Sequence, residues 1–389
     1  MTSTRVTPTR AEDQGRGRKG SGLRRHRLVL VVLSLGLLHR LAVAHAYPVF
    51  VFPDSQVYLS LAHPPDGGLG FSPGRPSGYS ILLRLISAVA GPALGNVTTL
   101  QHLSGLLVGG LAYALLVRSG LRRGLAAAIA ATLLLDGYVA ALEHDLLADS
   151  FFGAAVFTSL YLAIVAGRRS GPLLGSGLLL AAAVLIRSAG LFVVPVWLAY
   201  LVIARRGWRA GMSGLAGLAA PILVYCLAHQ AAGQGFAVTH SDGWFLYGRI
   251  AAIAQCDGAR IPPSTAPLCA GPALGPVAAV WDGASAARRL FAPGPAPPIG
   301  EDYPQGMTAE SNSLLRQWSI AVIREHPGPY LALVARDFLQ YFRAGERGVV
   351  AEVTLPGEPD RLLWYSRHVH TVRWLAGLLL LIGLLRGAL

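Results

Sequence analysis

The sequence predicts an all-α polytopic membrane protein. Of its 389 residues, 53% are hydrophobic and only 14% are charged. A soluble domain does not bury so large an apolar fraction. The apolar residues also occur in long runs separated by short arginine clusters, as in a chain that crosses a bilayer several times as helices.

The net charge of +13 does not indicate a nucleic-acid partner. The basic residues lie in short clusters between apolar runs rather than on one continuous face, which is the pattern of the positive-inside rule. Lys19 is the only lysine, and so strong a bias toward arginine is typical of a GC-rich bacterial genome. We therefore expect a multi-pass protein of a bacterial plasma membrane.

The chain begins with a polar segment, residues 1–27, which we expect to be a disordered basic tail in the cytoplasm. The apolar run from Leu28 to about Phe52 then crosses outward. It is too long for an ordinary signal peptide and lacks the cleavage-site pattern. This run opens a transmembrane core that we place at residues 28–229.

Further apolar runs predict the remaining spans. Several are shorter than the roughly 20 residues that cross a bilayer comfortably, so their ends are approximate. The predicted spans are 97–117, 125–142, 146–166, 172–186, 191–204, 212–228 and, at the C-terminus within 371–389, 372–385.

The stretch 79–94 decides the topology. If it crossed the membrane, the arginines at 118–123 would lie outside, against the charge rule. We therefore expect a juxtamembrane or re-entrant helix that breaks at Gly91-Pro92. The external loop then covers 53–96, and the following polar residues face outward: Asp54, Arg75, Glu143, Asp149 and Arg187.

A large hydrophilic segment at 230–370 is extracytoplasmic by the same count, and its proline and glycine content predicts many loops. Cys256 and Cys269 lie within it, and an oxidising compartment favours a disulfide between them over free thiols. Cys226, inside a predicted span, is expected to be a small core residue.

Near 330–343 this segment contains an amphipathic pattern. Leu331, Val334 and Phe338 recur at helical spacing, with Arg336 on the other side. Such a helix either lies on the membrane or packs on the transmembrane bundle, and we favour packing.

Three stretches, in order, carry a resemblance to a known family. An outward first helix leads to an external loop with Asp54 and Tyr58, followed by RPSGYSILL at 75–83; EHDLLADSF at 143–151 and LIRSAGL at 185–191 complete the set. This arrangement resembles the GT-C superfamily of polyprenyl-phosphate-dependent glycosyltransferases, in particular the protein O-mannosyltransferase and aminoarabinose-transferase branch. The resemblance covers about residues 28–230 and implies a GT-C-like helix bundle.

The resemblance implies sugar transfer from a polyprenyl-phosphate donor to an extracytoplasmic protein, glycan or lipid acceptor, by a single inverting displacement. Asp54 is then the general base on the acceptor hydroxyl. Arginines can bind the departing phosphate in a bidentate manner. The candidate phosphate ligands are Arg75 and Arg187, with Arg84 behind them, and the candidate acceptor or auxiliary residues are Tyr58, Tyr79, Glu143, His144 and Asp149.

Each assignment has a structural alternative. Asp54 could cap a helix that begins near Gln56, Arg75 could anchor the loop at lipid headgroups, and Arg187 could extend to the interface. The cluster Glu143, His144 and Asp149 positions the acceptor, binds a divalent cation or only terminates two helices, and no metal-ligand spacing decides among these. His39 and Arg40 are expected to mark helix packing rather than catalysis.

Two other functions remain open at this stage. A transporter or flippase of a lipid-linked precursor would use the same arginines to hold a phosphate, but it would need openings to both faces and no base. A non-catalytic subunit that keeps the fold is the third alternative. The sequence identifies neither the donor sugar nor the acceptor.

Overall fold

The computed structural model describes residues 25–275, 279–280, 282–293 and 306–342, and within them every regular element is a helix. This confirms the expected all-α class. The helices of the bundle are α2 (Arg27–Ala46), α3 (Pro53–Ala62), α4 (Gly78–Ala90), α5 (Leu94–Arg118), α6 (Arg123–Leu134), α7 (Gly137–His144), α8 (Asp149–Val165), α9 (Ser170–Ile186), η1 (Ser188–Phe192), α10 (Val193–Ile203) and α11 (Trp208–Ala231).

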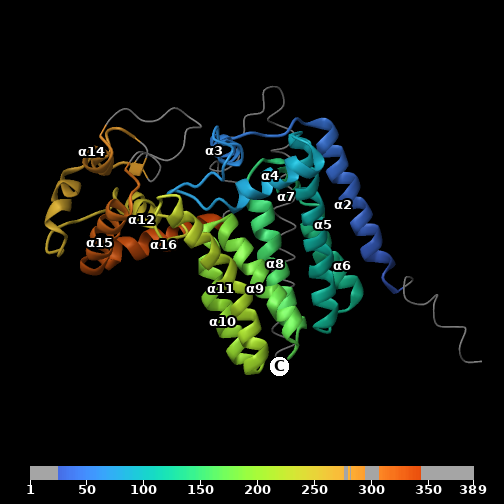
Figure 1. Ribbon diagram of the computed structural model, residues 1–389. Coiled ribbons are helices and arrows are strands. Elements are labelled where there is room, and N and C mark those ends of the chain that lie inside the picture. The colour runs from blue at the N-terminus through green and yellow to red at the C-terminus, as the bar shows by residue number, and fades with distance from the viewer. Residues whose placement is uncertain (1–24, 276–278, 281, 294–305, 343–389) are drawn as a thin grey trace, which may run out of the picture.

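The long helices stand side by side, and α3 and α4 lie at one end of the bundle, the upper end in Figure 1. Within the described residues, three helices are long and apolar enough to cross a membrane: α2, α5 and α11. A fourth span results if α6 and α7 count as one helix bent by 48°. These helices support the expectation of a membrane protein. Residues 1–24 of the predicted tail 1–27, and the predicted span 372–385, lie outside the described residues.

The helix α4 ends at the break that we expected in the stretch 79–94. Its 13 residues extend about 20 Å, short of the roughly 30 Å of a bilayer core. The helix ends at Gly91, whose φ of +91° suits glycine, and Pro92 follows before α5 begins at Leu94. The chain thus turns from a short helix at the upper end directly into a long helix of the bundle.

Small residues bring the central helices α9 and α11 together. A Cβ added to Gly177 would lie 2.0 Å from the carbonyl oxygen of Gly214, and one added to Gly217 would lie 2.4 Å from that of Leu174. Only glycine permits so close a backbone approach. In lipid the hydrophobic effect does not drive helices together, and small residues allow the close packing that does. This packing places the upper end of α11 beside the loop that precedes α4.

After α11 the chain forms a separate group of short helices: α12 (Asp242–Ile250), η2 (Pro263–Ala270), α14 (Ala286–Phe291), α15 (Ala309–Glu325) and α16 (Pro327–Phe342). They enclose their own core, in which Trp244, Leu315 and Trp318 are almost fully buried. The structure joins Cys256 and Cys269 in a disulfide beside this core, the pairing that we expected, and Cys226 is a buried free cysteine.

The last of these helices, α16, has the amphipathic pattern expected near 330–343. Tyr330 packs against the core of the helical group and Leu333 is buried, whereas Leu331, Val334 and Phe338 are exposed. The helix runs across the axes of the bundle helices at the height where α11 ends (Figure 1). Leu331, Val334 and Phe338 are therefore not covered by the bundle in the part of the chain that the structure describes.

Candidate functional site

Asp54 lies at the start of α3, at the upper end of the bundle. The helix begins at Pro53, earlier than the expected Gln56, and its N-cap is Phe52, whose backbone N–H donates to the Ser55 hydroxyl at 2.9 Å. Asp54 therefore occupies the first turn and is not the cap, which corrects the alternative that we considered from the sequence. Its carboxylate is left for another role, and 60% of its side chain is exposed.

Arg75 is the partner of Asp54. Its Nη2 donates to Asp54 Oδ1 at 2.9 Å, and its guanidinium carbon lies 4.8 Å from the ring centroid of Tyr58. In contrast to Asp54, the Arg75 side chain is only 10% exposed. A buried cation thus meets an accessible carboxylate at the site, and an anchor at lipid headgroups does not describe this position.

A second ion pair joins Arg187 to Asp149. Arg187 lies in the turn between α9 and η1, and Asp149 is the first residue of α8, so each charge stands at a helix end. Both side chains are partly accessible, at 44% and 40%. The two pairs together form what we call the paired-charge cluster: Asp54, Arg75, Asp149 and Arg187.

Two tyrosines connect the pairs. The rings of Tyr58 and Tyr79 contact edge to face, with centroids 4.8 Å apart. Burial raises the pKa of the Tyr58 hydroxyl, while the nearby guanidinium groups of Arg75 and Arg187 oppose that shift. Burial also raises the pKa of Tyr79, reinforced by the charges of Tyr58 and Asp149. Both phenols therefore remain neutral and can serve as hydrogen-bond donors or acceptors.

Asp145 is a carboxylate at this end that we did not select from the sequence, although it lies inside the quoted 143–151 stretch. Its side chain is buried, and burial, with a smaller contribution from Asp149, raises its pKa to about 7. The residue follows α7 in the loop before α8, where it also forms an isolated backbone bridge with Phe50. The buried carboxyl and the raised pKa mark Asp145 as an unusual group at the edge of the cluster.

Glu143 and His144 point away from the cluster, into the bundle. Arg40 donates to both carboxylate oxygens of Glu143, at 2.6 and 2.7 Å, and all of these side chains are almost fully buried. His102 on α5 bridges the two residues, with one ring nitrogen 3.0 Å from Glu143 and the other 3.2 Å from His144. As expected, Arg40 serves helix packing; the structure separates Glu143 and His144 from Asp149.

Gln101 links this buried network to the cluster. Its amide nitrogen donates to the backbone oxygens of Glu143 and Asp145, at 2.9 and 2.7 Å, and its amide oxygen accepts from the Tyr79 hydroxyl at 2.9 Å. Gln101 and His102 were also missed in the sequence. Polar residues within the apolar run 97–117 were the available signal, because such groups inside a span are costly unless they are satisfied.

Arg84 holds the loop between α3 and α4. Its guanidinium donates to the carbonyl oxygens of Gly67, at 2.8 Å, and Gly68. Its side chain therefore supports the loop between α3 and α4 rather than joining the paired-charge cluster. Within the described residues no group of three or more histidine, cysteine or acidic side chains is arranged to hold a metal ion.

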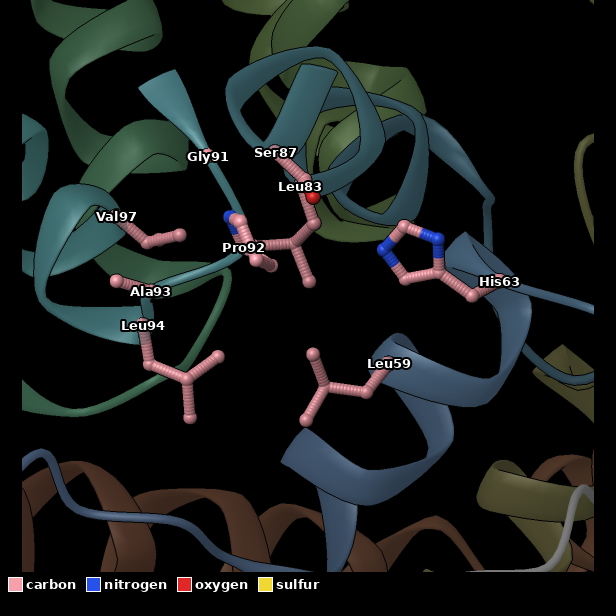
Figure 2. A pocket seen from close by; sticks show the side chains of 9 residues that line it. All are labelled: Leu59, His63, Leu83, Ser87, Gly91, Pro92, Ala93, Leu94 and Val97. Atoms are coloured by element: carbon pink, nitrogen blue, oxygen red, sulfur yellow. The ribbon is translucent and has the colours of Figure 1, made fainter. Parts of the chain in front are cut away.

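A small apolar pocket of about 30 Å³ lies at the other end of α3. Leu59, Leu83 and Leu94 extend into it from α3, α4 and the start of α5, and His63 borders it (Figure 2). Asp54 and His63 are nine residues apart, which corresponds to about 14 Å along a helix axis. The pocket is therefore small and apolar, and it lies at the opposite end of α3 from the charged cluster.

Comparisons with known proteins gave one structural similarity that we report. No family model and no curated protein matches the sequence. The structure aligns with that of the S. cerevisiae protein O-mannosyltransferase Pmt1–Pmt2 complex bound to the sugar donor, with a TM-score of 0.44 and 18% sequence identity, over 62% of this chain. The aligned part is 38% of the yeast chain, and we infer neither the donor nor the reaction of this protein from the match.

Proposed function

We propose that this protein is a GT-C-type glycosyltransferase that moves a sugar from a polyprenyl-phosphate donor to an extracytoplasmic acceptor. The observation that carries the proposal is the paired-charge cluster, in which the buried cation of Arg75 meets the accessible carboxylate of Asp54. The order of the sequence motifs that form this cluster supports the same class. Its position at the upper end of the bundle (Figure 1) is the outer face under the charge rule.

The two arginines are suited to the donor phosphate. Arg75 and Arg187 approach Tyr58 from two different loops, and each is balanced by an aspartate when no anion is bound. A phosphate oxygen competes with those carboxylates for the guanidinium N–H groups, and charge-assisted bidentate pairs of this kind are among the strongest hydrogen bonds in proteins.

Donor binding then gives Asp54 its role. When the phosphate takes the Nη2 donor of Arg75, the Asp54 carboxylate is released within the site and can accept the proton of an acceptor hydroxyl. The acceptor oxygen forms a bond with the anomeric carbon while the bond from that carbon to the phosphate oxygen breaks. The electron pair leaves with the phosphate, whose charge Arg75 and Arg187 stabilise, and the configuration at the carbon inverts.

The remaining predicted residues keep more limited roles in this proposal. Tyr58 and Tyr79 form the wall between the two ion pairs, and Asp149 orients Arg187. The proposed partners are the lipid-linked donor, the surrounding lipids and a protein, glycan or lipid acceptor, in a bacterial plasma membrane.

The test measures sugar release from a synthetic polyprenyl-phosphate sugar by purified protein in nanodiscs. Asp54→Asn keeps the side-chain volume but removes the proton acceptor, so we expect turnover to fall by roughly 100- to 10,000-fold. Arg75→Ala removes a charge-assisted contact worth about 1.5 to 3 kcal/mol and should raise the donor KM by roughly 10- to 150-fold. Asp66→Asn, an exposed aspartate of the same external loop, is the matched control and should change neither quantity.

Equal turnover for wild type and Asp54→Asn would contradict the role of Asp54. Translocation of the lipid without any sugar transfer would instead favour the transporter, and binding of the donor with neither transfer nor translocation would favour a non-catalytic subunit.

A further inference from the structure

We infer that α11 positions Arg75. Tyr225 and His229 of this helix fix the loop 71–77, so that the Arg75 guanidinium is already oriented to bind an anionic phosphate. This inference rests on the proposed function, since it assigns positioning residues to the proposed donor site. Neither residue belongs to the motifs that carry the family resemblance. Both lie near the end of α11, about 150 residues after the loop that they contact.

The loop itself is buried although it has no regular secondary structure. Ser72, Arg75 and Ser77 are all buried, and the Ser72 hydroxyl accepts the backbone N–H of Gly74 at 3.1 Å. A buried irregular segment needs partners for its backbone polar groups, and local turns satisfy only some of them. Contacts from α11 and from the chain that follows it satisfy several others.

Tyr225 holds the loop after Arg75. Its hydroxyl accepts the backbone N–H of Ser77 at 3.1 Å, and its ring packs against Phe71 with centroids 5.7 Å apart. The tyrosine is only 5% exposed, so water does not replace this contact. Ser77 immediately precedes α4, and Tyr225 thereby sets where the loop ends.

His229 holds the loop before Arg75. One ring nitrogen lies 3.3 Å from the carbonyl oxygen of Ser72, and the other lies 2.7 Å from the carbonyl oxygen of Gly235. The side chain is fully buried and also packs against Phe71. The backbone N–H of His240 donates to the Pro73 oxygen at 2.6 Å, which adds a further contact on the same side.

Arg75 thus lies between two fixed points, at 72–73 and at 77. An unrestrained arginine loses considerable side-chain and backbone freedom when it binds a ligand. When the loop is already fixed, binding the phosphate costs less conformational entropy, and the affinity for the phosphate is higher. The contacts with Tyr58 and Asp54 then orient the guanidinium at the front of the loop.

A double-mutant cycle tests this inference with polyprenyl phosphate, which lacks the sugar, as the probe. Its dissociation constant is measured for the full-length protein in nanodiscs with Tyr225→Phe, Arg75→Ala and both together. Tyr225→Phe keeps the ring but loses a neutral hydrogen bond, so we expect binding about 3- to 10-fold weaker. In the Arg75→Ala background the same change should have no further effect, because the hydroxyl acts through Arg75.

Matched variants separate positioning from general stability. Tyr113→Phe removes a tyrosine hydroxyl that pairs with His26 at the opposite end of the bundle, and it should leave binding unchanged. His229→Phe should weaken binding, and His229→Gln, which keeps donor groups, should recover part of the loss. Because Tyr225→Phe retains the buried ring, the cycle does not depend on whether His229→Phe folds.

Three results would overturn the inference: an equal loss for Tyr225→Phe in both backgrounds, no loss in either, or no measurable binding of polyprenyl phosphate by the wild type. Failure of the proposed function looks different. In that case the cycle shows the expected coupling, but the wild type transfers no sugar from the complete donor.

Discussion

Gly105 on α5 is a position where a single added methyl group should strongly lower the stability. A Cβ added there would lie 1.8 Å from Glu143 Oε1 and 2.5 Å from the carboxylate carbon. Glu143 cannot move aside, because Arg40 holds both of its oxygens and His102 lies 3.0 Å from one of them. Gly105→Ala must therefore break this buried ion pair or force α5 away from α7.

The expected magnitude follows from the pair that is broken. Removing one partner of a buried ion pair costs about 3–5 kcal/mol, since the other charge is left uncompensated. Gly110, on the same helix, has open space around its Cβ position, so Gly110→Ala should instead gain about 0.5–1 kcal/mol from helix propensity. The two variants add the same methyl group to the same helix with opposite expected signs.

The measurement is the free energy of unfolding of wild type, Gly105→Ala and Gly110→Ala, from denaturant titration in mixed micelles followed by tryptophan fluorescence. We expect Gly105→Ala to unfold at a clearly lower denaturant concentration. If Gly105→Ala were as stable as Gly110→Ala, the tight packing of Glu143 against α5 would be refuted.

Two further predictions concern the loop before α8 and the group of short helices after α11. The pKa of Asp145 is raised from 3.8 to about 7, so its contribution to stability is fully present below about pH 3.8 and is lost as the pH rises through about 7. The free energy of unfolding of Asp145→Asn should therefore be higher than that of the wild type by up to about 4 kcal/mol at pH 8. The difference should shrink toward pH 4. Parallel pH profiles of the unfolding free energy for the two proteins would contradict this. Replacing Cys256 and Cys269 by serine should destabilise the group of short helices after α11 by about 3 kcal/mol, because the disulfide closes a short loop with a sequence separation of 13. Amide hydrogen exchange of α12 and α15 measures that loss of stability, with the exchange of α5 as the internal control. Unchanged protection of α12 in the serine variant would contradict the prediction.

The charge rule predicted that the four residues of the paired-charge cluster lie at one end of the molecule. It placed Asp54, Arg75, Asp149 and Arg187 on the same side once the stretch 79–94 was kept from crossing, and the structure places both ion pairs at the upper end of the bundle. Sidedness depends on the order of apolar runs and arginine clusters, which is a local property of the chain. Which carboxylate pairs with which arginine is not a local property.

Glu143 illustrates that limit. It lies six residues before Asp149 and looked like part of the same acidic group, but it belongs to a separate network because α7 ends at His144 and α8 begins at Asp149. Its partner Arg40 is 103 residues away, and no spacing rule connects them. Tyr225 and His229 were missed for the same reason, since each contacts a loop about 150 residues earlier.

The Arg40–Glu143 pair also bears on how the chain enters the membrane. The first apolar helix carries Arg40 to a position where the cation is almost fully buried, yet the carboxylate that neutralises it is synthesised more than a hundred residues later. During that interval α2 contains an uncompensated charge, which is costly for an isolated helix in lipid. We expect α2 to stay beside the insertion machinery, or to remain shallow, until α5 and α7 arrive, so that these helices complete their insertion as a group.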